Sequence, residues 1–284
     1  ELAAGEAAPG PVVLKLEQLQ VTGTFKPRGA FNTLLGGDVP AEGVICASGG
    51  NHGIAVAYAA NRLGVHAEVF LPLSSSPVKV QMLRSLGAAV RQVGSVYAEA
   101  LDAMRERAAG TGALEVHAYD QPKTVAGQGT LFREWLEQDA GLDPARVAVG
   151  GGGLLGGALA AVGHARRIVA VEPRHAPTLA EALDADRPID VNVSGLASDS
   201  LGARRIGEIA FALARHHGVT SLTVGDDEIR AAQIWLWSHA RIVAEPGGAA
   251  AFAGLLSRAY HPGPDERIGV LICGANTDPA SLGG

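Results

Sequence analysis

The sequence TGTFKPRGA, at residues 22–30, places a lysine between an aromatic residue and a proline. Apolar surroundings disfavour a charged ammonium group, and a lysine amine that loses its proton becomes a nucleophile toward aldehydes. Phe25 and Pro27 could provide such surroundings for Lys26. A solvated surface lysine without any chemistry is the commoner case, so this motif alone leaves both interpretations open.

Four consecutive glycines, Gly150–Gly153, are followed by Leu154 and a helix-forming stretch. Such a run leaves backbone N–H groups free to converge on an anion, and the positive end of a following helix adds to the attraction. A phosphate monoester is the ligand we expect. A tight turn without a ligand is one alternative. A dinucleotide site is another, because glycines 151, 153 and 156 form a loose GxGxxG pattern, but Glu172 lies in a Glu-Pro turn and is poorly suited to bind a ribose.

The elements that must position these residues alternate between short β-branched runs and alanine-rich amphipathic stretches. This pattern predicts βαβ units and parallel sheets, in which ligands bind beyond the carboxyl ends of the strands. The predicted strands are 44–46, 68–71, 89–93, 114–116, 146–149, 168–171, 221–224 and 268–272, and the predicted helices are 53–63, 77–86, 97–108, 125–138, 202–216 and 228–239. Besides the glycine run, the loops SGGNHG (48–53) and CGAN (273–276) follow predicted strands. Residues 181–200 are expected to be irregular.

These motifs together resemble the serine/threonine dehydratase group of fold-type II enzymes that use pyridoxal 5'-phosphate (PLP), a group related to serine racemase and the tryptophan synthase β-subunit. The resemblance extends over nearly the whole chain, through LKLEQLQVTGTFKPRGA, SGGNHG, AGQGT, VGGGGLLGG, VAVEP, EPGGAA and LICGANTDP. It implies two open, twisted, mostly parallel sheets flanked by helices. We expect a small domain at residues 44–118, a large PLP-binding domain at residues 1–43 and 119–284, and the cofactor in the cleft between them.

The resemblance also implies roles for individual residues. Lys26 would carry the cofactor as a Schiff base, with Phe25 packing beside the ring. The loop asparagine, Asn51, would bond the ring hydroxyl group. The same loop would hold the substrate carboxylate through backbone N–H groups and a hydroxyl; its substrate-binding residues are Ser48, Gly49, Asn51 and His52.

Gly150, Gly151, Gly152, Gly153 and Leu154 match the phosphate cradle of the group, and Cys273 stands where relatives have a Ser or Cys facing the pyridine nitrogen. A neutral partner at that nitrogen favours elimination over chemistry that needs a long-lived carbanion. A small buried side chain without a catalytic role is the alternative for Cys273.

The predicted reaction is the β-elimination that converts L-threonine or L-serine to 2-oxobutanoate or pyruvate and ammonia. Racemases of the group carry a serine where this chain has Gly49, so we expect little racemisation. The alternatives are another eliminase or racemase acting on hydroxyaspartate, phenylserine or serine, and cysteine or threonine synthases, although these usually have KDR after the lysine. A protein of a different class, a non-catalytic module that binds a phosphate-bearing ligand, also stays open.

A cation site is implied by the stretch that begins with Glu172, through that carboxylate, the carbonyl of Ala176 and the side chain of Thr178. Relatives often have Asp or Ser at the last position. One carboxylate with neutral oxygens suits a monovalent ion or loosely held Mg²⁺ as well as Ca²⁺. The alternative is a plain Glu-Pro loop. Other histidines give no metal pattern: His117, His216 and His217 lack metal-site spacing, and His164 and His175 stay unassigned.

The net charge of −6 and the scattered basic residues argue against nucleic acid as a partner, and no uncharged stretch is a good transmembrane helix. Two cysteines and the absence of a visible secretory signal favour the cytoplasm. The resemblance implies a homodimer. Because no regulatory domain follows Asp278, we expect no feedback by isoleucine; a Thr-Pro segment usual in the group is missing ahead of Val12.

Overall fold

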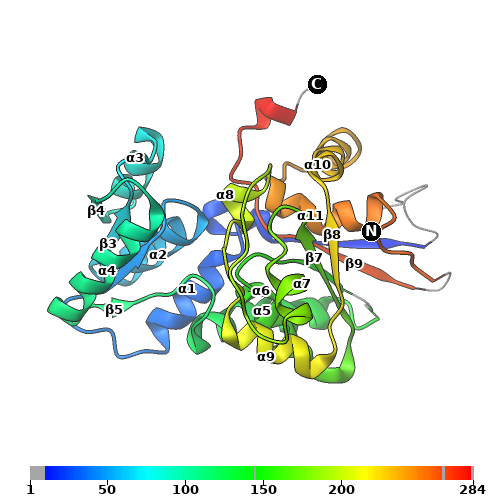
Figure 1. Cartoon of the computed structure of the whole chain (residues 1–284), viewed down its shortest axis with the longest axis horizontal. Helices are drawn as coiled ribbons and strands as arrows, with labels where there is room; N and C mark the ends of the chain where they lie inside the picture. The colour runs from blue at the N-terminus through cyan, green and yellow to red at the C-terminus, as the bar shows by residue number, and fades with distance from the viewer. Residues whose placement is uncertain (1–9, 142, 144, 264–265, 283–284) are drawn as a thin grey trace. The chain divides into compact units, whose positions relative to one another are not determined.

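A computed structural model describes residues 10–141, 143, 145–263 and 266–282 (Figure 1). The first nine residues, on which the predictions of a missing secretory signal and a missing Thr-Pro segment depend, lie outside the described residues. The chain divides into two compact units. Unit 1 comprises Glu1–Phe25 and Gln128–Gly284, and unit 2 comprises Lys26–Gly127.

Unit 2 is built on a parallel four-stranded sheet in the order β4-β3-β2-β5. Its strands are β2 (Val44–Ala47), β3 (Ala67–Leu71), β4 (Ala89–Gln92) and β5 (Leu114–Glu115). Alternate residues of β2 face opposite sides: Val44 and Cys46 pack with helices α1 (Lys26–Leu35), α2 (Asn51–Leu63) and α3 (Pro77–Ser85), whereas Ile45 packs with Met104 of α4 (Tyr97–Thr111). Both faces of the sheet are therefore covered by helices, as the continuous apolar strands require. The narrower small domain at residues 44–118 stays a prediction.

Unit 1 contains a parallel five-stranded sheet in the order β1-β9-β6-β7-β8. Its strands are β1 (Val12–Leu16), β6 (Ala145–Ala148), β7 (Ile168–Pro173), β8 (Ser221–Val224) and β9 (Ile268–Ile272), and its helices are α6 (Gly153–Val162), α7 (Thr178–Asp184), α8 (Ser198–Leu201), α9 (Glu208–His217), α10 (Asp226–Ala240) and α11 (Pro246–Leu256). Helix α5 (Pro122–Gln138) crosses the boundary between the units in sequence. The predicted α/β class with two parallel sheets is confirmed. Among the described residues, no helix combines the length and the apolar character that crossing a membrane requires.

The structure differs from the sequence predictions in three places. Strand β1 was not predicted; it contains Lys15, which is buried because its Nζ pairs with Glu134 and donates to Gln138 Oε1 at 2.8 Å. The helix predicted at residues 202–216 begins only at Glu208. The backbone before it makes a tertiary hydrogen bond in place of a helical one: the N–H of Gly207 donates to the carbonyl of Gly151 at 3.0 Å. The segment expected to be irregular also contains most of α7 and all of α8 except its end.

Candidate active site

Lys26 is the first residue of α1, and its ammonium group is held within unit 2. Nζ donates a hydrogen bond to the carbonyl oxygen of Ala118 at 2.9 Å, in the chain that follows β5. The residue before it is also fixed, since the N–H of Phe25 donates to the carbonyl of Cys273 at 3.1 Å and Phe25 is buried. The lysine is half-buried. Lys26 is therefore held in place at its side chain and at the preceding residue, Phe25. These contacts fix the direction in which its amine points.

The SGGNHG loop joins the end of β2 to α2, and Asn51 is the first residue of that helix. Within the loop, the N–H of Gly50 donates to Ser48 Oγ at 3.3 Å. The last glycine of the motif permits a very close approach: a Cβ atom on Gly53 would lie 1.9 Å from the carbonyl oxygen of Ser48. Only glycine therefore allows the loop to fold back against the first turn of α2.

His52, the fifth residue of this motif, is buried. Its Nε2 lies 2.8 Å from the carbonyl oxygen of Val116, which assigns a hydrogen to Nε2. Burial, aided by the positive charge of Lys26, lowers the pKa of His52 to about 3. The imidazole is therefore neutral at ordinary pH. Lys26 and His52 bind the carbonyls of Ala118 and Val116, so the lysine and the SGGNHG loop contact the same short segment of unit 2.

Unit 2 should lose stability in acid through His52. Between the unfolded value near 6.5 and the folded value of about 3, the unfolded state binds more protons, so the free energy of unfolding falls as the pH is lowered through this range. The slope from one such group is about 1.4 kcal/mol per pH unit. We expect urea unfolding to show a steeper loss from pH 7 to 5 for the wild type than for His52→Asn.

The exposed His66 of the same unit provides the control, and His66→Asn should keep the wild-type slope. Equal slopes for the wild type and His52→Asn would show that His52 is not held neutral in the folded protein.

The glycine run of unit 1 lies at the carboxyl end of β6 and leads into α6. Gly152 precedes the helix with a φ of 89°, and a Cβ atom there would lie 2.5 Å from Cβ of Ala210. The first N–H groups of a helix lack partners within the helix, and the helix dipole makes this end attractive to anions. The turn can therefore bind a phosphate group through its backbone.

Cys273 follows β9 at the same edge of the sheet, because β9 and β6 are parallel neighbours. The thiol is 4% exposed, and Sγ lies 3.6 Å from the carbonyl oxygen of Gly247. The close packing of this loop depends on another motif glycine: a Cβ atom on Gly248, in EPGGAA, would lie 2.1 Å from the carbonyl oxygen of Gly274. The sheet edge thus brings the glycine run and the buried thiol together.

Glu172 lies in β7, directly before its final residue Pro173, and is completely buried, which raises its pKa. One carboxylate oxygen accepts hydrogen bonds from Thr178 Oγ1 at 3.2 Å and Leu179 N–H at 2.7 Å. The other accepts from Ala180 N–H at 2.9 Å and Ser221 Oγ at 2.5 Å. The Thr178 hydroxyl also lies 2.5 Å from the carbonyl of Gly150. The carboxylate therefore links α7, β8 and the glycine run.

The predicted site residues fall into two groups. Unit 2 holds Lys26, Ser48, Gly49, Asn51 and His52. Unit 1 holds the others, which are Phe25, Gly150–Gly153, Leu154, Glu172, Ala176, Thr178 and Cys273. Two partners of the first group were not predicted, namely the carbonyls of Ala118 and Val116. A main-chain carbonyl carries no sequence signal, so only the fold could identify them.

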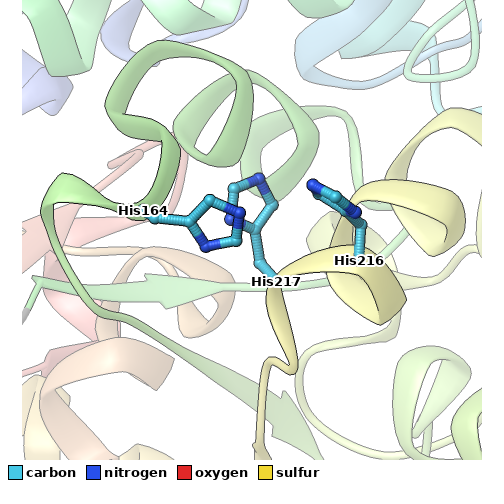
Figure 2. A group of neighbouring side chains, drawn as sticks. All are labelled: His164, His216 and His217. Carbon is cyan, nitrogen blue, oxygen red and sulfur yellow. The ribbon is translucent and has the colours of Figure 1, made fainter.

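His216 and His217 have no metal-site spacing along the chain, but the fold adds a third histidine to them. They lie beside His164, and the ligand nitrogens of the three side chains are within 4.8 Å of one another (Figure 2). Spacing along the chain could not predict this cluster, because the fold brings the loop after α6 to the end of α9. The adjacent histidine pair was the one available signal. His117 is not part of this cluster; its Nδ1 accepts the N–H of Asp120 at 2.8 Å.

Comparisons with known proteins agree on one family. The family described as pyridoxal-phosphate dependent enzyme matches residues 2–274. The phenylserine dehydratase of Ralstonia pickettii is 38% identical over 287 residues, which cover 98% of this chain and 86% of that protein. The biosynthetic L-threonine dehydratase of Escherichia coli is 37% identical over 94% of this chain, which spans only 53% of that protein. Maize serine racemase has a similar structure, with a TM-score of 0.89, 29% identity and coverage of 95% of this chain and 85% of that one.

Proposed function

Because the chain belongs to the family of pyridoxal-phosphate dependent enzymes, we propose that it eliminates the β-hydroxyl group of L-threonine, L-serine or both and releases 2-oxobutanoate or pyruvate with ammonia. It is a PLP-dependent lyase of the threonine dehydratase type. The observation that carries the proposal is the anchored Lys26, which binds the carbonyl of Ala118, two residues from the Val116 carbonyl that His52 of the SGGNHG loop contacts.

The residues present fit PLP by their chemistry. The cofactor needs an amine for its aldehyde, and Lys26 is half-buried and oriented by Ala118. It needs anion-binding N–H groups for its phosphate, and Gly150–Gly153 with Leu154 begin α6 after a strand. The proposal assigns these residues to the same PLP, with Phe25 beside its ring, Asn51 at its hydroxyl group and Cys273 at its pyridine nitrogen.

PLP, when bound, supplies the electron sink that makes loss of the α-proton possible. Lys26 would hold the cofactor through its amine and, as a free amine, would accept the substrate α-proton as general base. Ser48, Gly49, Asn51 and the N–H of His52 bind and orient the substrate carboxylate at the start of α2. The pKa of His52 is lowered to about 3, so its imidazole is too weak a base to compete with Lys26 for the proton.

The thiol of Cys273 would give the pyridine nitrogen of PLP a neutral partner. It is buried, and its sulfur lies 3.6 Å from the carbonyl of Gly247, a geometry in which the thiol keeps its hydrogen. A neutral group cannot stabilise positive charge on the ring nitrogen as a carboxylate would. This supports rapid elimination over reactions that store negative charge in the ring for longer.

The substrate is tested by a panel of L-threonine, L-serine, phenylserine and hydroxyaspartate, with release of the keto acid and of ammonia measured for each. We expect the highest kcat/KM for threonine or serine. Phenylserine is the second candidate because a relative named phenylserine dehydratase is 38% identical over 98% of the chain. Keto acid from none of them would exclude the proposed elimination, and a protein that cannot be loaded with PLP would favour a module that binds a phosphate-bearing ligand.

Replacing Gly49 by Ser should increase racemisation of serine relative to its elimination. A Cβ atom at this position would meet only side-chain atoms within 4 Å, the nearest being Leu71 Cδ2 at 3.0 Å, so a serine fits after a small shift. Its hydroxyl group adds the second acid that racemases similar to this chain carry. Chiral chromatography of D-serine alongside pyruvate measures the ratio. An unchanged ratio in a correctly folded variant would mean that Gly49 does not limit racemisation.

The cation site at Glu172, the Ala176 carbonyl and Thr178 is part of the proposal. The support is one completely buried carboxylate, whose burial raises its pKa and which a cation would stabilise in the charged form. We expect kcat/KM to fall when K⁺ is replaced by a large organic cation in the presence of a chelator. Unchanged activity would assign Glu172 a purely structural role, in which it binds the N–H groups of Leu179 and Ala180.

The proposal extends to a homodimer in the cytoplasm, as the resemblance to the dehydratase group implies. Light scattering on the eluting protein gives its mass in solution, to be compared with 29.0 kDa for one chain. A mass of one chain at micromolar concentration would exclude the dimer.

A further inference from the structure

We propose that His164, His216 and His217 form a binding site for a divalent transition metal ion of the Zn²⁺ class on unit 1. Their ligand nitrogens all lie within 4.8 Å of one another. Figure 2 shows His164 reaching from the turn after α6 toward the two histidines at the end of α9. None of the three belongs to the site assigned to PLP, so this site is independent of the proposed function.

The three side chains come from two packed elements. His164 lies in the short 3-10 helix η4 (Gly163–Ala165), directly after α6, and the other two are the last residues of α9. Helices α6 and α9 pack together. The imidazole rings are in contact: the ring centroids of His164 and His217 are 4.3 Å apart, and His216 lies 5.2 Å from His164 and 5.1 Å from His217. The fold therefore holds the three rings together without a ligand.

The geometry suits a metal after small rotations. Zinc binds histidine nitrogen at about 2.0–2.1 Å, so two ligands of a tetrahedral site lie about 3.3 Å apart. His164 and His216 are exposed and His217 is half-buried. The two exposed rings can therefore rotate to bring the ligand nitrogens from within 4.8 Å of one another to the shorter separation that zinc requires. Imidazole is a preferred ligand of Zn²⁺, Cu²⁺ and Ni²⁺, whereas Mg²⁺ and Ca²⁺ prefer oxygen.

The surrounding electrostatics favour a cation at this position. The negative end of the α9 dipole lies at its last turn, which carries two of the ligands. The nearby Arg215 is paired with Asp186 at 3.1 Å, and Arg167 is paired with Glu266 at 2.8 Å. These pairs neutralise two of the positive charges of the region, whereas Arg166, among the described residues, donates only to the backbone carbonyls of Ala140 at 2.6 Å and Ala165 at 3.1 Å, so the helix end has to offset its charge.

A cavity of about 420 Å³ borders the cluster and is lined by His164 and His217. Its other lining residues include Arg166, Arg167 and Tyr260. Among the described residues, the group of histidines, cysteines and acids that could hold a metal contains these three histidines alone, with no fourth protein ligand. The open coordination position therefore belongs to water. Three histidines and a water are the ligand set of zinc sites that keep one position open to solvent.

The test uses tag-free holoenzyme that has been treated with a chelator and dialysed, titrated with ZnCl₂ in a calorimeter. We expect one saturable Zn²⁺ per chain for the wild type and at least tenfold weaker binding for His164→Ala and for the double variant His216→Ala/His217→Ala. The exposed His261 provides the control, and His261→Ala should bind as the wild type does. Zinc should also raise the melting temperature of the wild type but not of His164→Ala.

Melting curves without zinc establish whether the variants are folded, and His164→Asn replaces His164→Ala if the latter melts early. Absence of saturable binding to the wild type would overturn the proposal. Wild-type affinity in both histidine variants would overturn it as well, because the zinc would then be bound elsewhere on the chain. Since His164 takes no part in the proposed elimination, His164→Ala should keep full activity in a buffer that contains K⁺ and no added zinc.

Discussion

Replacing Lys26 by Ala is expected to abolish keto acid formation, with a loss in kcat of at least about a thousandfold, because one side chain supplies both the nucleophile and the general base. The same change should remove the absorbance at roughly 410 nm of PLP bound to a lysine. The Ala118 carbonyl would lose its 2.9 Å hydrogen bond, a small effect for a half-buried group. Activity is measured as 2-oxobutanoate released from L-threonine, and the absorbance is recorded on the same sample.

Lys79 offers a matched control. It lies on α3 of the same unit and is exposed, so Lys79→Ala should retain wild-type absorbance and turnover. A Lys26→Ala variant that kept a tenth of the wild-type kcat would contradict the assignment of Lys26 as base.

Replacing Gly53 by Ala is expected to have the second-largest effect. The added Cβ atom would overlap the Ser48 carbonyl oxygen at 1.9 Å, so the loop to which we assign the substrate carboxylate must move. A displacement of about 1 Å at a reacting group can cost about a hundredfold in rate. We expect a loss of this size in kcat/KM for threonine, whereas the absorbance of lysine-bound PLP persists, because Lys26 lies on α1 and not on this loop.

Gly110 is the matched control for Gly53. It lies in α4 of the same unit, and a Cβ atom there would meet nothing within 4 Å. Gly110→Ala should keep full activity and raise the free energy of unfolding by about 0.5–1 kcal/mol through helix propensity. If Gly53→Ala were folded and as active as Gly110→Ala, the tight turn at Ser48 would not be needed for catalysis.

The sequence was sufficient to predict eight of the strands, because most of them are short apolar runs, often with β-branched residues, between glycine-rich or polar loops. It was insufficient for β1. That strand contains Lys15, a charged residue that becomes buried only because α5 supplies Glu134 and Gln138. The start of α9 was also misjudged: Gly207 precedes the first turn of the helix and donates its backbone N–H to the carbonyl of Gly151 in the glycine run. Such tertiary hydrogen bonds outweigh local propensity.

For the candidate site, the motifs identified the loops but not what holds them in place. The structure explains why glycine is required at Gly53 and Gly248, where another backbone would overlap any Cβ atom. It also identifies the environment that keeps His52 neutral, which depends on burial and on Lys26. Neither the close approaches nor the three-histidine cluster could follow from spacing, since each joins segments that only the fold brings together.

Reduction of the purified holoenzyme with borohydride, followed by peptide mapping, tests the central claim most directly. The chain contains four lysines, Lys15, Lys26, Lys79 and Lys123, so the position of the trapped cofactor is unambiguous. We predict the mass of the reduced PLP adduct on the peptide containing Lys26 and on none of the other three, and protection of that lysine from reduction when L-threonine is present. An adduct on another lysine, or no adduct on a protein that still forms 2-oxobutanoate, would contradict the account.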